Sequence, residues 1–200
     1  MQGYESYDSL QHFQLFNVFG SCCFWQKRTV FKELIRRFVC VCSDLNSSNL
    51  TVVPPVVFNI MSHAQVKECD ISGNLLNNIP PQLALDFQAL TKLNISHNFL
   101  AILPVEMGNL PALETLDLSS NLFYALPDIV FKLPHLSHLY AQNNFISEFD
   151  LSQPIKSDRM NVFDLRYNPL NSSFRIKLVN KYTKFRLVLN EEGVYNEEEQ

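Results

Sequence analysis

Histidine and cysteine are the side chains of this sequence that could bind a metal or act as nucleophiles, and their spacing supports neither chemistry. The 200 residues include five of each. No histidine pair occurs with a cysteine at metal-ligand spacing. The sequence also lacks a glycine-rich phosphate loop and a nucleophile elbow. We therefore expect a non-enzymatic protein with no catalytic residue, no cofactor and no metal site.

A recurring column of polar residues could instead recognise a partner. It contains Asp44, Asp70, Asn94, Asp117, Tyr140 and Asp164, and three further candidates lie beside it, namely His138, Arg166 and Tyr167. If these residues lie on neighbouring strands about 5 Å apart, the stacked carboxylates raise the local negative potential. Such a surface suits a basic or amide-rich protein, with the two tyrosines as anchors. The alternative is structural, because an aspartate here can also pair laterally with neighbouring polar groups.

The elements that must position this column are copies of one repeated phrase. The phrase is leucine, two variable residues, leucine, one variable, leucine, two variable, asparagine, one variable and leucine. The chain carries it twice between residues 90 and 127, 23 residues apart, and each copy closes with an aliphatic residue and a proline, Leu103-Pro104 and Leu126-Pro127. Fixed-period self-similarity of this length is typical of solenoid proteins.

The same frame extends in both directions. Six copies begin at residues 40, 66, 90, 113, 136 and 160, and the first of them is degenerate. Five copies carry an asparagine in register, namely Asn74, Asn98, Asn121, Asn144 and Asn168. The alternating leucines predict a short strand with one apolar face. Each asparagine offers an acceptor and two donors, so we expect it to satisfy backbone groups on its own turn and the next, as a structural ladder.

These repeats resemble the leucine-rich repeat superfamily over residues 40–170. The resemblance implies an α/β solenoid with a parallel concave sheet, about six repeats and a helical cap at each end. A closer likeness, to a group of small leucine-rich-repeat-containing proteins, rests on the C-terminal segment FDLRYNPLNSSFRIKLVNKYTKF. It implies a small intracellular protein with no established chemistry.

The flanks of the repeats divide into four parts. Residues 1–24 read as a poorly ordered extension. Residues 25–39 are predicted to form an amphipathic cap helix, since the open edge of a solenoid must be covered. We expect the N-terminal cap, the repeats and a C-terminal cap at 171–189 to form one domain, residues 25–189. In the C-terminal cap, Phe174, Leu178, Val179 and Tyr182 recur at helical spacing. Residues 190–200 read as an acidic, disordered tail.

Composition favours a monomer in the cytoplasm or nucleus. The formal charge of −4 implies no nucleic-acid binding. No apolar run reaches the 18 residues of a membrane span, and the acidic start does not suit a signal peptide. The scattered cysteines read as reduced thiols. Four Asn-x-Ser/Thr matches, at Asn46, Asn49, Asn94 and Asn171, read as accidental.

Three functional interpretations follow. The first is an intracellular interaction module or scaffold that binds an unidentified protein on its concave face. The second is a membrane-peripheral adaptor, anchored by the aromatic, basic N-terminal segment that contains Cys22 and Cys23. The third, an extracellular receptor fragment, requires secretion.

Overall fold

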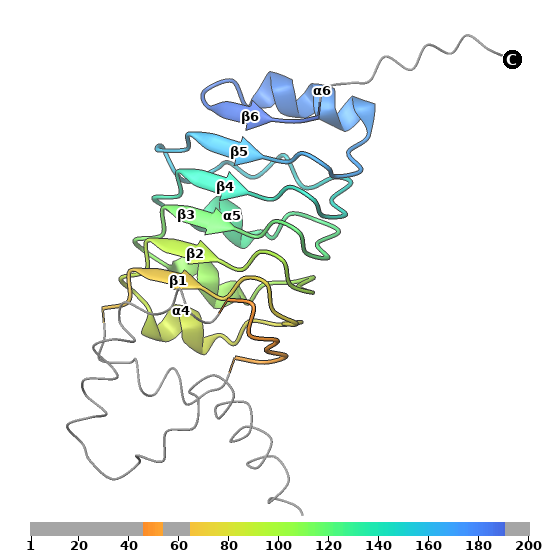
Figure 1. Ribbon diagram of the computed structural model, residues 1–200. Helices are drawn as coiled ribbons and strands as arrows, with labels where there is room; N and C mark the ends of the chain where they lie inside the picture. Colours follow the sequence, from red (N-terminus) through yellow and green to blue (C-terminus); the bar gives the residue numbers. More distant parts are fainter. Residues whose placement is uncertain (1–45, 54–64, 191–200) are drawn as a thin grey trace, which may run out of the picture.

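The computed structural model describes residues 46–53 and 65–190, which stack as turns of a solenoid (Figure 1). Its sheet is parallel and follows chain order, with strands β1 Glu68–Asp70, β2 Lys92–Asn94, β3 Thr115–Asp117, β4 His138–Tyr140, β5 Val162–Asp164 and β6 Arg186–Val188. The central residues of the strands pair in register, for example Leu93 with Leu116 and Leu116 with Leu139. The prediction of an α/β solenoid with a parallel sheet is confirmed.

Short helices return the chain behind the sheet (Figure 1). They are α4 Gln82–Asp86, the 3-10 helix η2 Val105–Asn109, α5 Ile129–Lys132 and α6 Ser172–Lys181. A proline precedes each of the first three and fixes the backbone where a missing N–H does no harm. Pro81 and Pro104 occupy the cap positions of α4 and η2, and the Pro127 carbonyl accepts from Val130 in α5. The segment between β4 and β5 returns without a helix.

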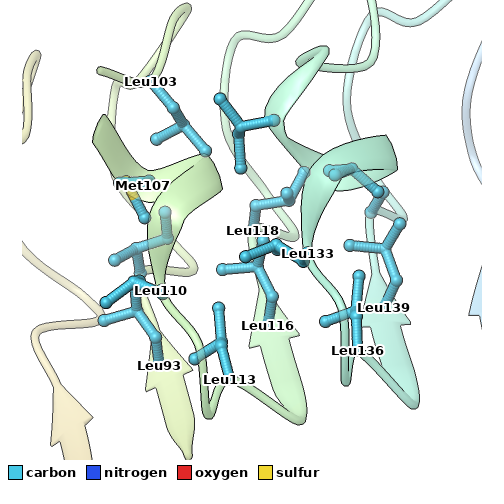
Figure 2. Close-up of a cluster of buried hydrophobic side chains, with 14 of the residues drawn as sticks. Leu93, Leu103, Met107, Leu110, Leu113, Leu116, Leu118, Leu133, Leu136 and Leu139 are labelled. Atoms are coloured by element: carbon cyan, nitrogen blue, oxygen red, sulfur yellow. The ribbon is translucent and has the colours of Figure 1, made fainter. Parts of the chain in front are cut away.

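The core lies between the strands and these return segments. Leu93, Leu116 and Leu139 project from successive strands, and Met107 and Leu110 meet them from the layer behind (Figure 2). All five are fully buried or nearly so. Burial of one such side chain stabilises the fold by about 1.5–3 kcal/mol, so the leucine positions of the phrase supply most of the driving force.

The five asparagines form a column of hydrogen bonds at the turns that follow the strands, in which four are buried and Asn168 is half-buried. Asn121 is representative: its Nδ2 donates to the carbonyls of Leu118 and Ser119 in its own turn and to that of Ile95 in the preceding turn. Its Oδ1 accepts from Leu100 N–H, also in the preceding turn, at 3.0 Å. Asn121 therefore bonds to its own turn and to the preceding turn, whereas the expectation from the sequence was its own turn and the next.

A left-handed residue precedes each ladder asparagine and produces the sharp turn out of the strand. The φ angle is positive at Gly73, His97, Ser120, Asn143 and Tyr167. Left-handed backbone cannot continue a sheet ladder, so the turn leaves groups for the asparagine to pair. Gly73 also lacks room for a side chain, because a Cβ there would lie 2.7 Å from Ser47 Oγ.

The C-terminal segment closes the solenoid with both a helix and a strand. The Asn171 side chain accepts from Phe174 N–H at 2.8 Å and caps α6. Phe174, Leu178 and Tyr182 are buried as their helical spacing predicts, but Val179 is exposed and does not belong to the buried stripe. Within the alternating residues 185–189, Arg186–Val188 form β6, which extends the parallel sheet beyond the last repeat.

Part of the predicted organisation lies outside the described residues. This holds for the N-terminal extension 1–24, the cap helix 25–39, Asp44 and the start of the first repeat, and for residues 191–200 of the tail. Of the first repeat, Ser48 and Leu50 are described, and the N–H groups of both donate to Asn74 Oδ1 at 3.0 Å. The ladder thus reaches the degenerate first copy, where Ser48 replaces asparagine.

Candidate functional site

The exposed face of the sheet is hollowed over β1 to β4. The hollow has a volume of about 730 Å³ and its lining includes Asp70, Asn94, Thr115, Asp117 and Tyr140. Of the eight predicted binding residues that the structure describes, four therefore share one depression: Asp70, Asn94, Asp117 and Tyr140. The strands bring them together because each is the last residue of its strand and the strands pair in register.

The acidic and amide members of this column also stabilise their own turns. Asp70 Oδ1 accepts from Ser72 N–H at 2.9 Å, and Asn94 and Asp117 accept in the same way from the residue two positions later. Asp70 Oδ2 additionally accepts from Asn94 Nδ2 at 3.0 Å. The structural alternative expected from the sequence is therefore present. Each side chain uses only part of its hydrogen-bonding capacity for it.

Asp164 does not fit the prediction of an exposed acidic residue. It is 3% exposed, and its carboxylate accepts from the Arg166 guanidinium at 2.6–3.1 Å as well as from Arg166 N–H. The hydrogen bonds and charge of Asp164 raise the pKa of Arg166. The two charges compensate each other, so neither Asp164 nor Arg166 offers a free charge to a partner.

Tyr140 lines the hollow and forms an aromatic pair with His138, which is not among the lining residues. Both project from β4 on the same face, and their ring centroids lie 6.4 Å apart in a stacked arrangement. His138 Nδ1 also lies 2.8 Å from Ser137 Oγ. Tyr140 is aligned with Asp117 on one side and Asp164 on the other. A phenol cannot accept from its own turn as aspartate does, so this side chain is not required for the turn.

Tyr167 lies apart from the hollow. It occupies the left-handed position of the turn after β5, with φ 56° and 64% of its surface exposed, and its N–H donates to Asn190 Oδ1. The structure thus places Tyr167 at the edge where the strands end and not on the sheet face.

Two residues at the starts of strands, Glu68 and Thr115, were not predicted to belong to the site. Glu68 and Thr115 line the hollow beside Lys92, and Glu68 forms an exposed ion pair with Lys92 at 2.7 Å. The hydrogen bond from Lys92 to Glu68, followed by the charge of Glu68, raises the pKa of Lys92. These positions could have been found from the period of two, because they precede the column by two residues and share its face.

Residues 46–53 and 65–190 contain no group of three or more His, Cys, Asp or Glu side chains that could hold a metal. Within the same part of the chain, no helix is long and apolar enough to cross a membrane. Cys69 is a buried cysteine in the core, where the phrase elsewhere places leucine or another apolar residue.

Comparison with known proteins agrees with this geometry. Residues 64–123 match the family model described as leucine rich repeat. The fold is a leucine-rich-repeat solenoid. Two solved structures share it, each with a TM-score of 0.55: a leucine-rich-repeat protein of Leptospira interrogans (20% identical, covering 70% of this chain and 40% of that one) and an internalin of Listeria monocytogenes (18% identical, covering 76% and 44%).

Curated relatives are longer proteins that contain similar repeats. Adenylate cyclase of Schizosaccharomyces pombe is 28% identical over 134 residues, which are 64% of this chain and 8% of that protein. Podocan-like protein 1 of Mus musculus is 28% identical and covers 83% of this chain, and Receptor-like protein 41 of Arabidopsis thaliana is 33% identical and covers 55%. The chain spans 29% or less of the length of each. The likeness concerns the leucine-rich-repeat solenoid.

Proposed function

We propose that this solenoid is a non-enzymatic interaction module that binds another protein in the hollow over β1 to β4. The observation that carries the proposal is the pairing of an available carboxylate, Asp117, with a large aromatic side chain, Tyr140, in one depression. We infer a partner that presents basic or amide-rich groups. A cytoplasmic or nuclear setting is part of the proposal, in keeping with the scattered cysteines of the sequence.

The charge of the hollow supports a basic partner. The lining carries three carboxylates, Glu68, Asp70 and Asp117, against two lysines, Lys67 and Lys92, and Lys92 is already paired with Glu68. Asp117 uses one carboxylate oxygen for Ser119 N–H, and within the described part of the chain its other oxygen has no hydrogen-bond partner. An approaching arginine or lysine can therefore bind the second oxygen of Asp117 without breaking an existing ion pair.

Tyr140 supplies the apolar contact beside this charge. Tyrosine is enriched among interface residues that dominate binding energy, because it buries a large area with few rotatable bonds. Its ring also attracts a cation above its face. Asp117 and Tyr140 lie side by side on paired strands, so one basic side chain can contact both.

We predict that Tyr140→Ala weakens binding of the captured partner about 30-fold, the effect of losing one dominant interface residue. Asp117→Asn should slow association several-fold, with a smaller difference at high salt. The asparagine keeps the turn acceptor, as Asn94 shows in the same column. The measurement is affinity capture from cell lysate, followed by binding kinetics with the purified partner.

Glu106→Gln is the matched control, since it removes one carboxylate from η2 on the opposite side of the sheet. It should bind like the wild type. The proposal is wrong if Glu106→Gln abolishes binding while the double variant Tyr140→Ala/Asp117→Asn retains it. Asp164 is unsuited to this test, because it is the buried member of an ion pair and its replacement would remove the acceptor of both the Arg166 guanidinium and the Arg166 N–H.

Within the superfamily, we propose a close relationship to leucine-rich repeat-containing protein 20. The support is the C-terminal segment 163–185 quoted above, together with a short chain of about six repeats. This likeness agrees with a non-enzymatic intracellular role and does not specify the partner.

The membrane-peripheral alternative depends on residues 22–38, which lie outside the described residues. We predict that the protein stays in the supernatant after cell fractionation, because a single acyl chain gives only marginal membrane binding. The check is partition of the wild type and of a Cys22→Ser/Cys23→Ser variant. Robust membrane recovery of the wild type that the double variant loses would favour the adaptor instead.

A further inference from the structure

A row of exposed apolar side chains runs along the edge of the solenoid at which the strands end. Leu75, Phe99, Leu122 and Phe145 each follow a ladder asparagine directly, and all four are exposed. The repeat phrase requires no apolar residue here, because it leaves this position variable. The fold therefore does not explain why four successive repeats carry leucine or phenylalanine.

The backbone brings these four residues into one column. Phe99 N–H donates to the carbonyl of Leu76, the residue after Leu75, at 2.8 Å. Leu122 and Phe145 bond to the preceding turn in the same way, at 2.8 and 2.9 Å. Adjacent members thus sit on adjacent turns. Tyr124 adds to the column by stacking on Phe145, with ring centroids 5.5 Å apart. We call these five residues, with Ile102 of the Phe99 loop, the apolar ridge.

The ridge is almost free of charge. The four loops that carry it, 72–79, 96–103, 119–126 and 142–149, contain one acidic side chain, Glu148, and no lysine or arginine, in a chain with 18% charged residues. Exposed apolar surface with aromatic enrichment and charge depletion is typical of the centre of a protein interface. The ridge lies beside the sheet and not over it, so a partner there leaves the hollow open.

We propose that the ridge binds the ridge of a second copy of this chain, forming a two-fold symmetric dimer. A two-fold contact requires a patch that is complementary to itself. The column reads Leu, Phe, Leu, Phe, so an antiparallel copy sets Leu75 opposite Phe145 and Phe99 opposite Leu122. Every leucine then faces a phenylalanine, whereas a parallel arrangement would place leucine opposite leucine and phenylalanine opposite phenylalanine.

Area and charge also suit a second copy. From their exposed fractions, the six ridge residues expose on the order of 700 Å², close to the ~800 Å² per partner of an interface of standard size. The chain carries a formal charge of −4, so two copies repel each other generally. The uncharged ridge is a place where they can meet without bringing carboxylates together. The expectation from the sequence was a monomer, whereas the ridge indicates self-association.

The test is sedimentation of the full chain at concentrations up to about 100 µM, a range that detects a micromolar dimer. We expect the wild type to dimerise. Leu122→Glu should raise the dissociation constant at least about 30-fold, as expected for a central interface residue. Leu85→Glu is the matched control, since Leu85 is also an exposed leucine, on α4 and away from the ridge, and should leave the dimer unchanged.

Register is tested by mixing two ridge variants, Phe99→Lys and Leu122→Glu. Each alone should be monomeric, while the mixture should recover a heterodimer, because the lysine of one copy faces the glutamate of the other. Circular dichroism establishes that both variants fold. A monomeric wild type, or a Leu122→Glu variant that still dimerises, would overturn the proposal. Failure of the mixture to associate would overturn the antiparallel arrangement.

Discussion

Replacement of Asn121 by alanine is expected to lower the free energy of unfolding by about 3 kcal/mol. The side chain is 3% exposed and forms four hydrogen bonds to backbone groups of two turns. Alanine leaves one N–H, that of Leu100, and three carbonyls without this partner. Each buried unsatisfied group costs about 1–3 kcal/mol, and relaxation of the turn recovers part of the sum. Urea unfolding, with midpoint and slope compared, measures the loss.

Asn77→Ala provides the control. Asn77 is also an asparagine that follows a strand, but it is exposed, so its replacement should change stability by less than about 0.5 kcal/mol. Asn121→Asp should destabilise at least as strongly as alanine, because a carboxylate would face three carbonyls. An Asn121→Ala protein with the midpoint and slope of the Asn77→Ala protein would show that the column of hydrogen bonds contributes no net stability.

The fold could be predicted from the sequence because each rule acts locally and repeats. Leucines two residues apart must share a strand face, and a fixed period places the next strand beside the first. The position of Leu93 opposite Leu116 follows from these two facts alone. The ladder was partly predictable for the same reason: the chemistry of asparagine indicated bridging, but not which neighbouring turn it would bridge.

The candidate site was less predictable, because exposure depends on neighbours that the phrase does not encode. Asp70, Asp117 and Asp164 occupy the same position of the repeat, yet Asp164 is buried. It lies between Tyr140 of β4 and Val188 of β6, with Arg166 as ion partner. From the sequence, residues 185–189 are expected to be part of a cap, and β6 instead gives Asp164 a neighbour on each side. Asp117 also lies between two strands, so the feature that distinguishes Asp164 is the Arg166 guanidinium bound to its carboxylate.

The aromatic cluster at the C-terminal end was not predicted, although its members are visible in the sequence. Phe163 replaces the central leucine of the repeat on β5. Its ring lies 6.2–6.4 Å from those of Phe149, Tyr182 and Phe185, which come from the loop before β5 and from the two ends of the segment joining α6 to β6. Such a cluster depends on side-chain volume at the last turn, where no further repeat supplies leucines. Burial raises the pKa of Tyr182, with a further contribution from the charge of Asp150.

Replacement of Phe163 by alanine is therefore expected to cost about 4 kcal/mol, in the range for phenylalanine removed from a packed core. The side chain is completely buried, and its loss leaves three rings without their common contact. Val162→Ala is the matched control on the same strand, since Val162 points to the opposite face and is half-buried; it should cost less than about 1 kcal/mol. Denaturant unfolding measures both losses.

Hydrogen exchange of the Phe163→Ala protein distinguishes a cap from an ordinary core position. In a solenoid each turn contacts chiefly its neighbours, so a weakened last turn can open while the others stay closed. Amides of α6 and β6 should exchange faster, and those of β2 and β3 should keep their protection. Uniform acceleration along the chain would mean that the solenoid opens as one unit. In that case the aromatic cluster stabilises the whole domain, and the terminal turn has no independent stability.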